Sequence, residues 1–413
     1  MGKSIRVLTL GTGIAQGIML LGIIVLSQLY SPSEFGVYAV TLGFATIVSA
    51  ASSFRYEMTI LLPKYDRASQ LALRLSFLVT LITNATGTII VLSMVATGSF
   101  SAFWLVVPIA SFSASIINIG SFLQNRKKRY ARIVGVQIVR SAIFVVSATL
   151  AFWLEFEGNG LVGAMALSMA LPATFLLVTD FRRANAFVGL SQKRRLIFWA
   201  RKHRKFVYYS TPAVFVSSLA SQAPVVLLSA LVGFGVAGYY AMIQRVMVAP
   251  ITLISRAVNQ VYLQSVTSRL ASGEAIYGFT KSLIRKFLLP GLVLAGLMVV
   301  AFQIGVLEKM FGDQWQGVDA LALVMIPAFC ISFVAKSIAG FAVLGRNEVG
   351  LIYQLILLFS VSAAIVISIF FTQSLVLIFS AISLALSLCF LGQSISILKI
   401  SRNMDRSIER VVV

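Results

Sequence analysis

Ionisable side chains are scattered through stretches of the sequence that otherwise carry almost no charge. Five are cations and one is a carboxylate: Arg55, Glu57, Arg140, Arg245, Arg256 and Lys336. Ionisable groups inside membrane spans are costly, and they usually face a cavity or a partner. Arginine suits phosphate because its planar guanidinium binds two oxygens at once. We therefore expect these six residues to form a binding site for an anionic, phosphate-bearing substrate.

Position along the predicted helices ranks the candidates. Arg245 lies closest to the middle of its span, so snorkelling toward the interface explains it least. Snorkelling explains Arg55 and Arg256 better. Arg55 and Glu57 are two positions apart on a predicted helix, which places them on roughly opposite faces. We therefore do not expect them to pair with each other, and Glu57 is the only acidic candidate near a membrane interior.

Uncharged polar side chains in the spans could hydrogen-bond sugar hydroxyls. They are Gln16, Asn84, Asn118, Gln137, Gln222, Gln244, Asn259 and Gln260. Hydrogen bonding between helices explains any single one of them at least as well.

The remaining reactive residue types suggest no catalysis and no metal site. Cys330 and Cys389 lie in apolar runs with neither disulfide nor metal-ligand spacing. His203 stands among four cations that would repel a metal ion. No Asp-x-Asp sequence is present, and hydration explains Glu155 and Glu157 on one short loop. We expect a protein that is not an enzyme and that needs no cofactor.

The composition identifies the elements that must hold these side chains. Of the 413 residues, 59% are hydrophobic and only 11% are charged, with a mean hydropathy of +0.94. Soluble proteins carry about 25% charged residues, so the chain is expected to be a polytopic membrane protein. The net charge of +21 then reflects Lys and Arg in cytoplasmic loops, and no nucleic-acid partner is expected.

Charge-free runs of roughly 20 residues predict transmembrane helices. We predict an all-α fold of about twelve such helices, in two six-helix lobes around a central cavity. Their approximate positions are 8–28, 35–54, two within 75–125 turning near Thr97-Gly98-Ser99, 133–154, 158–179, two from 206 onward turning near Gly233-Phe234-Gly235, 287–307, 319–344, and two within 349–398 turning near Thr372-Gln373-Ser374.

An N-terminus on the cytoplasmic side places nearly all loop cations inside. Lys309 is the exception, and six acidic residues fall outside: Glu34, Glu155, Glu157, Glu308, Asp313 and Asp319. Both termini are then cytoplasmic. The first helix lacks a small-residue cleavage site, so it is expected to be retained.

A basic loop divides the chain. We expect an N-terminal lobe over 1–181, a cytoplasmic linker over 182–206, a C-terminal lobe over 207–398 and a tail over 399–413. The linker segment 194–201 mixes cations with Trp and Phe, which suits a helix lying against anionic headgroups. A solvated basic linker is the alternative.

The two lobes echo each other in sequence. Leu26-Ser27-Gln28-Leu29 and Gly36-Val37-Tyr38-Ala39 match Leu228-Ser229-Ala230-Leu231 and Gly238-Tyr239-Tyr240-Ala241, at an offset of 202 residues. An even number of helices in each lobe makes this a parallel repeat about the membrane normal. Such repeats place a cavity between two lobes that can rock, as in alternating-access transporters.

Four stretches resemble a known family. They are Leu29–Tyr38, Phe54–Lys64 with its Arg-Tyr-Glu and Leu-Pro-Lys elements, Asn125–Tyr130, and Phe311–Trp315 followed by Leu344-Gly345-Arg346. Over nearly its whole length the chain resembles the Wzx-type polysaccharide-biosynthesis flippases of the multidrug/oligosaccharidyl-lipid/polysaccharide exporter superfamily.

This resemblance implies a function and a location. It implies translocation of an undecaprenyl-diphosphate-linked oligosaccharide, such as an O-antigen, capsule or exopolysaccharide repeat unit, across the bacterial inner membrane. Its partners would be that substrate, membrane lipids and other polysaccharide-assembly proteins. The alternatives are a multidrug exporter of the same superfamily, which would tend to use membrane carboxylates, and a peptidoglycan lipid II flippase, many of which carry additional helices.

The charge asymmetry makes a topology prediction. Reporters fused after residue 157 or 313 should read periplasmic, and fusions after 128, 200 or 405 should read cytoplasmic. A periplasmic signal at 200 would contradict the two-lobe arrangement, because every later loop would change sides.

Overall fold

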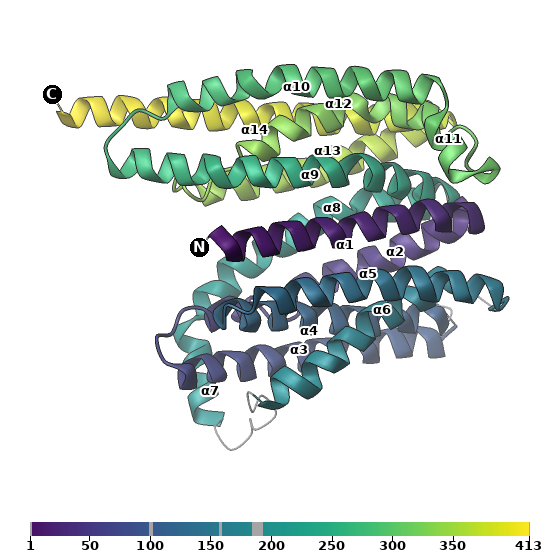
Figure 1. The fold of residues 1–413 in the computed structure, drawn as a ribbon, viewed down its shortest axis with the longest axis horizontal. Coiled ribbons are helices and arrows are strands. Elements are labelled where there is room, and N and C mark those ends of the chain that lie inside the picture. Colours follow the sequence, from purple (N-terminus) through teal and green to yellow (C-terminus); the bar gives the residue numbers. More distant parts are fainter. Residues whose placement is uncertain (1, 99–101, 157–158, 184–192, 413) are drawn as a thin grey trace. The chain divides into compact units, whose positions relative to one another are not determined.

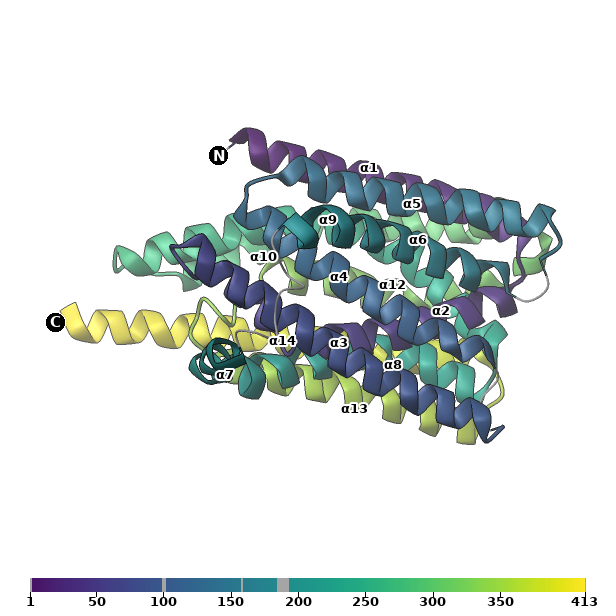
Figure 2. The ribbon, with the colours of Figure 1, turned by 90° about the horizontal axis from the view of Figure 1, so that it is seen from below.

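A computed structural model describes residues 2–98, 102–156, 159–183 and 193–412. Ser99 of the first predicted turn, Glu157 of the outer loop and residues 184–192 of the linker therefore lie outside the described residues. Within the described ranges every regular element is a helix. The chain forms two compact units, Met1–Val226 and Leu227–Val413, whose helices are drawn from two directions in Figure 1 and Figure 2.

Unit 1 contains the first six long helices. These are α1 (Gly2–Leu29), α2 (Pro32–Ala51), α3 (Asp66–Ala96), α4 (Val106–Arg126), α5 (Tyr130–Trp153) and α6 (Gly160–Leu176). Between them lie two 3₁₀ segments, η1 (Tyr56–Ile60) and η2 (Ala102–Leu105).

The basic linker contains a helix of its own. α7 (Lys193–Lys202) is flanked by two π-helical turns, η3 (Leu177–Phe181) and η5 (Phe206–Ser210). After η5 the chain enters α8 (Thr211–Leu231), in which the boundary between the two units falls.

Unit 2 contains the remaining elements. These are α9 (Phe234–Ala271), α10 (Tyr277–Gln303), α11 (Val306–Phe311), η6 (Asp313–Trp315), α12 (Val318–Ser337), α13 (Asn347–Phe371) and α14 (Leu375–Val412).

The all-helical, polytopic fold is confirmed. Each of the twelve predicted spans corresponds to a long helix, and eleven of the described helices are long and apolar enough to cross a membrane. The remaining one is α9, with 38 residues. It is long enough, but Gln244, Arg245, Arg256 and Asn259 make it less apolar.

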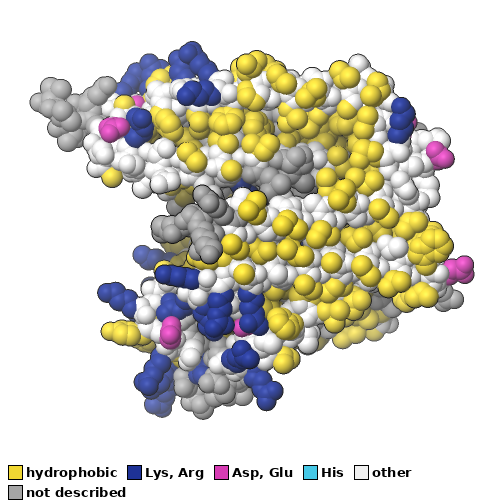
Figure 3. Space-filling view, in the orientation of Figure 1, with side chains coloured by type: hydrophobic (Ala, Val, Ile, Leu, Met, Phe, Trp, Pro, Cys, Tyr) yellow, Lys and Arg dark blue, Asp and Glu magenta, His cyan; other side chains and the backbone are white. Residues whose placement is uncertain are grey.

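The surface agrees with a lipid environment. Apolar side chains cover the middle of each unit, while Lys and Arg gather toward one end of the helices (Figure 3). Phe371 is 86% exposed and Trp153 is 72% exposed. Exposure of so much apolar surface is favourable only in contact with lipid. The protein is a multi-pass membrane protein.

Two predicted boundaries were wrong for local reasons. The second span ends at Ala51 and not near 54, because Phe54 and Arg55 adopt left-handed φ angles of 49° and 60° that no α-helix contains. The tenth span ends at Ser337 and not near 344. A turn that begins at Gly340 takes the place of its expected last residues.

Two pairs of repeated residues are buried in both units, and their tyrosines pack on different helices. Leu26 and Leu228 are both fully buried. Tyr38 packs against Phe144 with ring centroids 5.2 Å apart. Its repeat partner Tyr240 is also buried, and packs against an aromatic ring of α14.

Close packing of α1 against α5 depends on two glycines. A β-carbon at Gly11 would overlap Val134, and one at Gly22 would overlap Val145. The glycines are eleven residues apart, which is about three helical turns, so they lie on one face. By contrast, a β-carbon at Gly17 would meet nothing within 4 Å.

This contrast predicts opposite effects of the same substitution. Gly22→Ala should destabilise the protein by about 1–3 kcal/mol, because valine is stiff and the helices must separate. Gly17→Ala should be neutral or stabilising by up to about 1 kcal/mol, through helix propensity. Thermal unfolding in detergent, followed by size-exclusion chromatography, measures both. Equal midpoints for the two variants would contradict the packing.

Candidate functional site

Arg55 and Glu57 lie in a tight turn after α2. Arg55 adopts a left-handed conformation at the start of η1, and this bends its side chain back toward Glu57. Arg55 Nη1 donates to Glu57 Oε1 at 3.2 Å, and the Ser53 hydroxyl donates to Glu57 Oε2. The expectation that Arg55 and Glu57 do not pair was wrong, because opposite faces exist only on a continuous α-helix.

The Arg55–Glu57 pair stabilises the turn through a buried ion pair. Glu57 is fully buried, whereas the Arg55 side chain is 20% exposed. Arg55 Nη2 also contacts Met58 Sδ at 3.0 Å. A buried carboxylate needs such partners, since an unpaired one is strongly destabilising. The primary contacts of Arg55 are therefore within the turn.

Two of the predicted cations lie where two helices of unit 2 are joined. Arg256 lies on α9 directly after Ser255, and Lys336 lies in the last turn of α12 directly before Ser337. The two helices are joined beside them, where Ser255 Oγ donates to Phe333 O at 3.3 Å and Asn259 Nδ2 donates to Ala339 O at 2.7 Å.

Neither of these cations forms an ion pair within the described part of the chain. The Lys336 ammonium lies 5.9 Å from the ring centroid of Phe390 on α14. A helix C-terminus attracts one cation, which accounts for Lys336 alone. It does not account for a second cation beside it, so the pair is suited to hold an anion.

Arg245 and Arg140 lie in different units. Arg245 is half-buried in α9, beside Gln244, whose side-chain amide donates to the Tyr240 hydroxyl at 2.8 Å. Arg140 is exposed on α5 and forms no ion pair with a described carboxylate. Convergence of Arg140 with the cations of unit 2 on one cavity stays a prediction.

Glu57 is not the only buried carboxylate, contrary to expectation. Asp180 is 1% exposed in η3, and Arg132 Nε lies 3.1 Å from its Oδ2. Asp319 is 5% exposed and accepts hydrogen bonds from the amides of Leu307 and Glu308. The one signal in the sequence that could have indicated a partner for Asp180 was the cation Arg132, which lies in the first turn of α5.

Two of the eight polar candidates join helices. Asn84 accepts from the Ser111 hydroxyl at 2.6 Å, and Asn259 binds the end of α12. For these two the helix-bonding alternative holds. Gln244 binds Tyr240 one turn earlier on the same helix. Asn118 and Gln260 are exposed.

The linker helix α7 docks on the turn that carries Arg55 and Glu57. Leu196 is buried, and Trp199 Nε1 donates to Thr59 Oγ1 at 3.2 Å. The Tyr56 hydroxyl donates to Ala200 O at 3.4 Å, and burial raises the pKa of Tyr56, so this donor keeps its proton.

His203 continues this docked surface. Its ring lies 4.5 Å from that of Trp199 and 6.3 Å from that of Phe206. Burial lowers the pKa of His203 from its usual value, and the positive charge of Lys202 lowers it further. The imidazole is therefore neutral at pH 7 and packs as an aromatic ring.

Comparison with known proteins defines the fold. No family model and no curated protein matches the sequence. Solved structures do match. A lipid II flippase, MurJ, in an inward closed conformation has a TM-score of 0.75 at 10% identity, covering 98% of this chain and 92% of that one. An inward-facing multidrug resistance MATE family transporter of the MOP superfamily has a TM-score of 0.61 at 14% identity, covering 98% and 96%.

A MOP superfamily transporter from Pyrococcus furiosus has a TM-score of 0.57 at 16% identity, covering 98% of this chain and 95% of that one. That protein is described as having a binding pocket of reverse polarity that suggests a different function. The chain thus has the fold of MOP superfamily transporters over almost its whole length.

The buried turn predicts a non-additive mutation cycle. Arg55→Gln should destabilise the protein by about 3 kcal/mol, because it leaves Glu57 charged, buried and with one partner fewer. The double substitution Arg55→Gln with Glu57→Gln should recover more than about 1 kcal/mol of this loss. Thermal unfolding in detergent is measured for wild type, Arg55→Gln, Glu57→Gln and the double variant. Strict additivity would show that the pair does not support the turn.

Proposed function

We propose that the chain is a flippase that moves an undecaprenyl-diphosphate-linked oligosaccharide from the inner to the outer leaflet of the bacterial inner membrane. Three observations support this proposal. The fold is that of MOP superfamily transporters. One of the similar proteins is described as a lipid II flippase. The sequence stretches around Arg55 and Arg126 resemble those of Wzx-type flippases.

The observation that carries the proposal is the pair of cations Arg256 and Lys336 at the place where α9 and α12 are joined. Two cations near each other in a membrane protein are unfavourable unless an anion compensates their charge. A diphosphate has the charge and the several oxygens to satisfy both. The carboxylates that could have compensated these cations are already engaged elsewhere, as Glu57, Asp180 and Asp319 show.

The position of the pair fits uptake from the cytoplasmic leaflet. Arg256 lies about 33 Å along α9 from its first residue, and Lys336 about 27 Å along α12. With the predicted topology both are near the inner boundary of a hydrocarbon layer of about 30 Å. Arg245 lies about 16 Å along α9, near the midplane.

These positions suggest two stages of transport. The headgroup would first bind at Arg256 and Lys336 on the inner side. It would then meet Arg245 as the two units rock between inward-open and outward-open states. A cation near the midplane lowers the cost of moving a diphosphate past the centre of the bilayer.

The fold likeness also favours a second candidate, a lipid II flippase. A TM-score of 0.75 over most of both chains links this fold to one such protein. Its headgroup is also an anionic lipid-linked sugar, so the same cations would serve. Complementation of a strain depleted of its lipid II flippase, in parallel with a strain lacking its O-antigen flippase, separates the two candidates.

A multidrug exporter of cationic drugs fits the charges less well. Such a protein needs membrane carboxylates that are available to a cation. Here the buried carboxylates Glu57 and Asp180 have arginine partners, and Asp319 binds backbone amides.

The cation pair predicts a defined loss of function. The double substitution Arg256→Gln with Lys336→Gln should lower complementation of an O-antigen flippase deletion at least tenfold, because each charge-assisted contact contributes about 1.5–3 kcal/mol. Protein abundance should be unchanged. Arg245→Ala should also abolish complementation, and Arg245→Lys should restore it in part, since a point charge lacks the bidentate geometry.

The matched control removes two cations from the same unit. Arg285 and Lys286 are exposed on α10, and replacing both with Gln should leave complementation within about twofold of wild type. Normal complementation by the Arg256→Gln, Lys336→Gln protein would remove the main support for an anionic substrate.

A further inference from the structure

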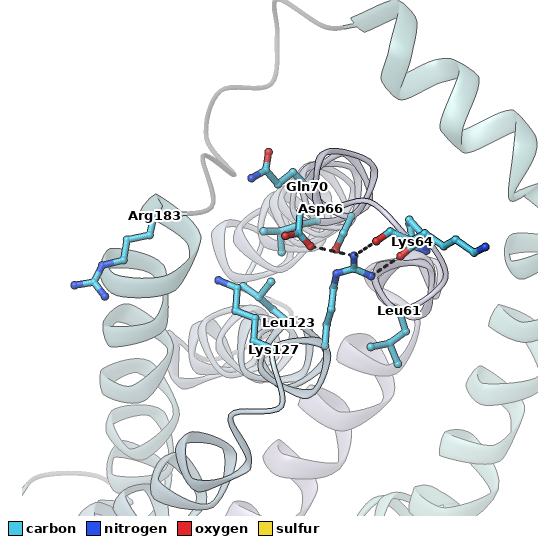
Figure 4. Close-up of a pocket in the computed structure, with 11 residues that line it drawn as sticks. Leu61, Lys64, Asp66, Gln70, Leu123, Lys127 and Arg183 are labelled. Atoms are coloured by element: carbon cyan, nitrogen blue, oxygen red, sulfur yellow. Dashed lines mark hydrogen bonds and ion pairs between the residues drawn. The ribbon is translucent and has the colours of Figure 1, made fainter.

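A pocket of about 630 Å³ lies in unit 1, at the end where Lys and Arg gather. It is bounded by the loop before α3, the first turns of α3, the last turn of α4 and the segment that follows η3 (Figure 4). The charged residues of its lining are Lys64, Asp66, Arg126, Lys127 and Arg183. None of these residues is among the intramembrane candidates described above.

Arg126 builds the floor of the pocket. Its Nη1 donates to Pro63 O at 2.7 Å and to Ile60 O at 3.2 Å, and its Nη2 donates to Asp66 Oδ1 at 3.1 Å. Ser69 Oγ also donates to Ile60 O at 3.1 Å. These bonds fix the loop and neutralise Asp66, so the pocket is formed in advance of any ligand.

Two cations border the open side of this floor. Figure 4 shows Gln70 and Lys127 near Asp66, and Arg183 beyond Lys127 on the segment that follows η3. The guanidinium of Arg183 is directed away from the other labelled residues, and so is the Lys64 ammonium. Within the described residues neither Lys127 nor Arg183 has a carboxylate at ion-pair distance.

Part of the lining is apolar. Leu61, Leu73 and Leu123 contribute side chains to it. The predicted topology places this end of unit 1 at the boundary between the membrane and the cytoplasm. Apolar lining does not stabilise a bound soluble phosphate compound. The glycerol and first methylenes of a lipid, by contrast, bury apolar surface against it, which favours binding. Basic pockets between membrane helices on the cytoplasmic side are a known setting for acidic lipid headgroups.

We propose that this pocket binds the phosphate headgroup of an anionic phospholipid from the cytoplasmic leaflet. The phosphate lies beside Lys127, Gln70 donates to it, and the Arg183 side chain turns toward it on binding. The leucine side chains of the lining receive the upper part of the acyl chains. This site is separate from the proposed transport cations and does not depend on what the protein transports.

The pocket is connected to the linker helix. The loop that Arg126 holds begins at Ile60, directly after Thr59, which accepts the hydrogen bond of Trp199 on α7. A bound headgroup therefore braces the same segment on which α7 docks. Loss of the lipid should loosen α7 without altering the helices of unit 1.

The test compares two double variants that remove the same charge. Lys127→Gln with Arg183→Gln removes both pocket cations. Lys128→Gln with Arg182→Gln removes their exposed sequence neighbours, which do not line the pocket. Each full-length protein is purified in neutral detergent and titrated with dioleoyl phosphatidylglycerol, and bound lipids are counted by native mass spectrometry. Inorganic pyrophosphate is titrated in a parallel arm.

The proposal makes a specific forecast for each arm. The pocket variant should bind one phosphatidylglycerol fewer than wild type, with its affinity for the first lipid at least tenfold weaker, since each cation near a headgroup contributes about fivefold. The control variant should stay within about twofold of wild type. Pyrophosphate should bind wild type far more weakly than the lipid does.

Two results would overturn the proposal. Equal lipid binding by the two variants would show that the pocket does not hold a headgroup. Tight pyrophosphate binding that only the pocket variant loses would identify a site for a soluble phosphate compound instead. Neither result bears on transport, so failure here and failure of the proposed function are distinguishable.

Discussion

The need to compensate charge inside a membrane governs this structure. Each buried carboxylate has a specific partner: Glu57 has Arg55, Asp180 has Arg132, and Asp319 has two backbone amides. These contacts stabilise a turn, a π-helical helix end and the start of α11. Because the carboxylates are engaged in this way, Arg256 and Lys336 have no carboxylate partner among the described residues. In the proposed function, an anionic substrate compensates their charge.

Glycine contacts and helix-end contacts position these charges. Gly11 and Gly22 allow α1 to approach α5 closely, and Ser255 and Asn259 fix α9 to the end of α12. The linker is tied in as well, because Trp199 of α7 bonds to the segment that follows the Arg55–Glu57 turn. One short stretch of chain between α2 and α3 in unit 1 thus carries the Arg55–Glu57 pair, the loop that Arg126 holds and the contact with α7.

The sequence predicted the fold well because the cost of exposing charge to lipid dictates where spans can lie. Turns at Gly98, Gly233 and Thr372 were found for this reason. It predicted local contacts less well. The Arg55–Glu57 pair depends on left-handed φ angles that hydropathy cannot reveal. The approach of Arg256 to Lys336, and of Arg132 to Asp180, depends on how helices distant in sequence pack, and no residue spacing encodes that.

Recognition of a charged diphosphate is the central claim, and a reconstituted assay tests it most directly. The purified protein is placed in liposomes with a fluorescent disaccharide linked to undecaprenyl through a diphosphate, and with the same disaccharide linked to undecaprenyl without phosphate. Transfer between leaflets is followed by quenching from outside. The account predicts rapid transfer of the diphosphate-linked sugar and transfer of the neutral one at the rate of protein-free liposomes. Equal transfer of both would contradict it.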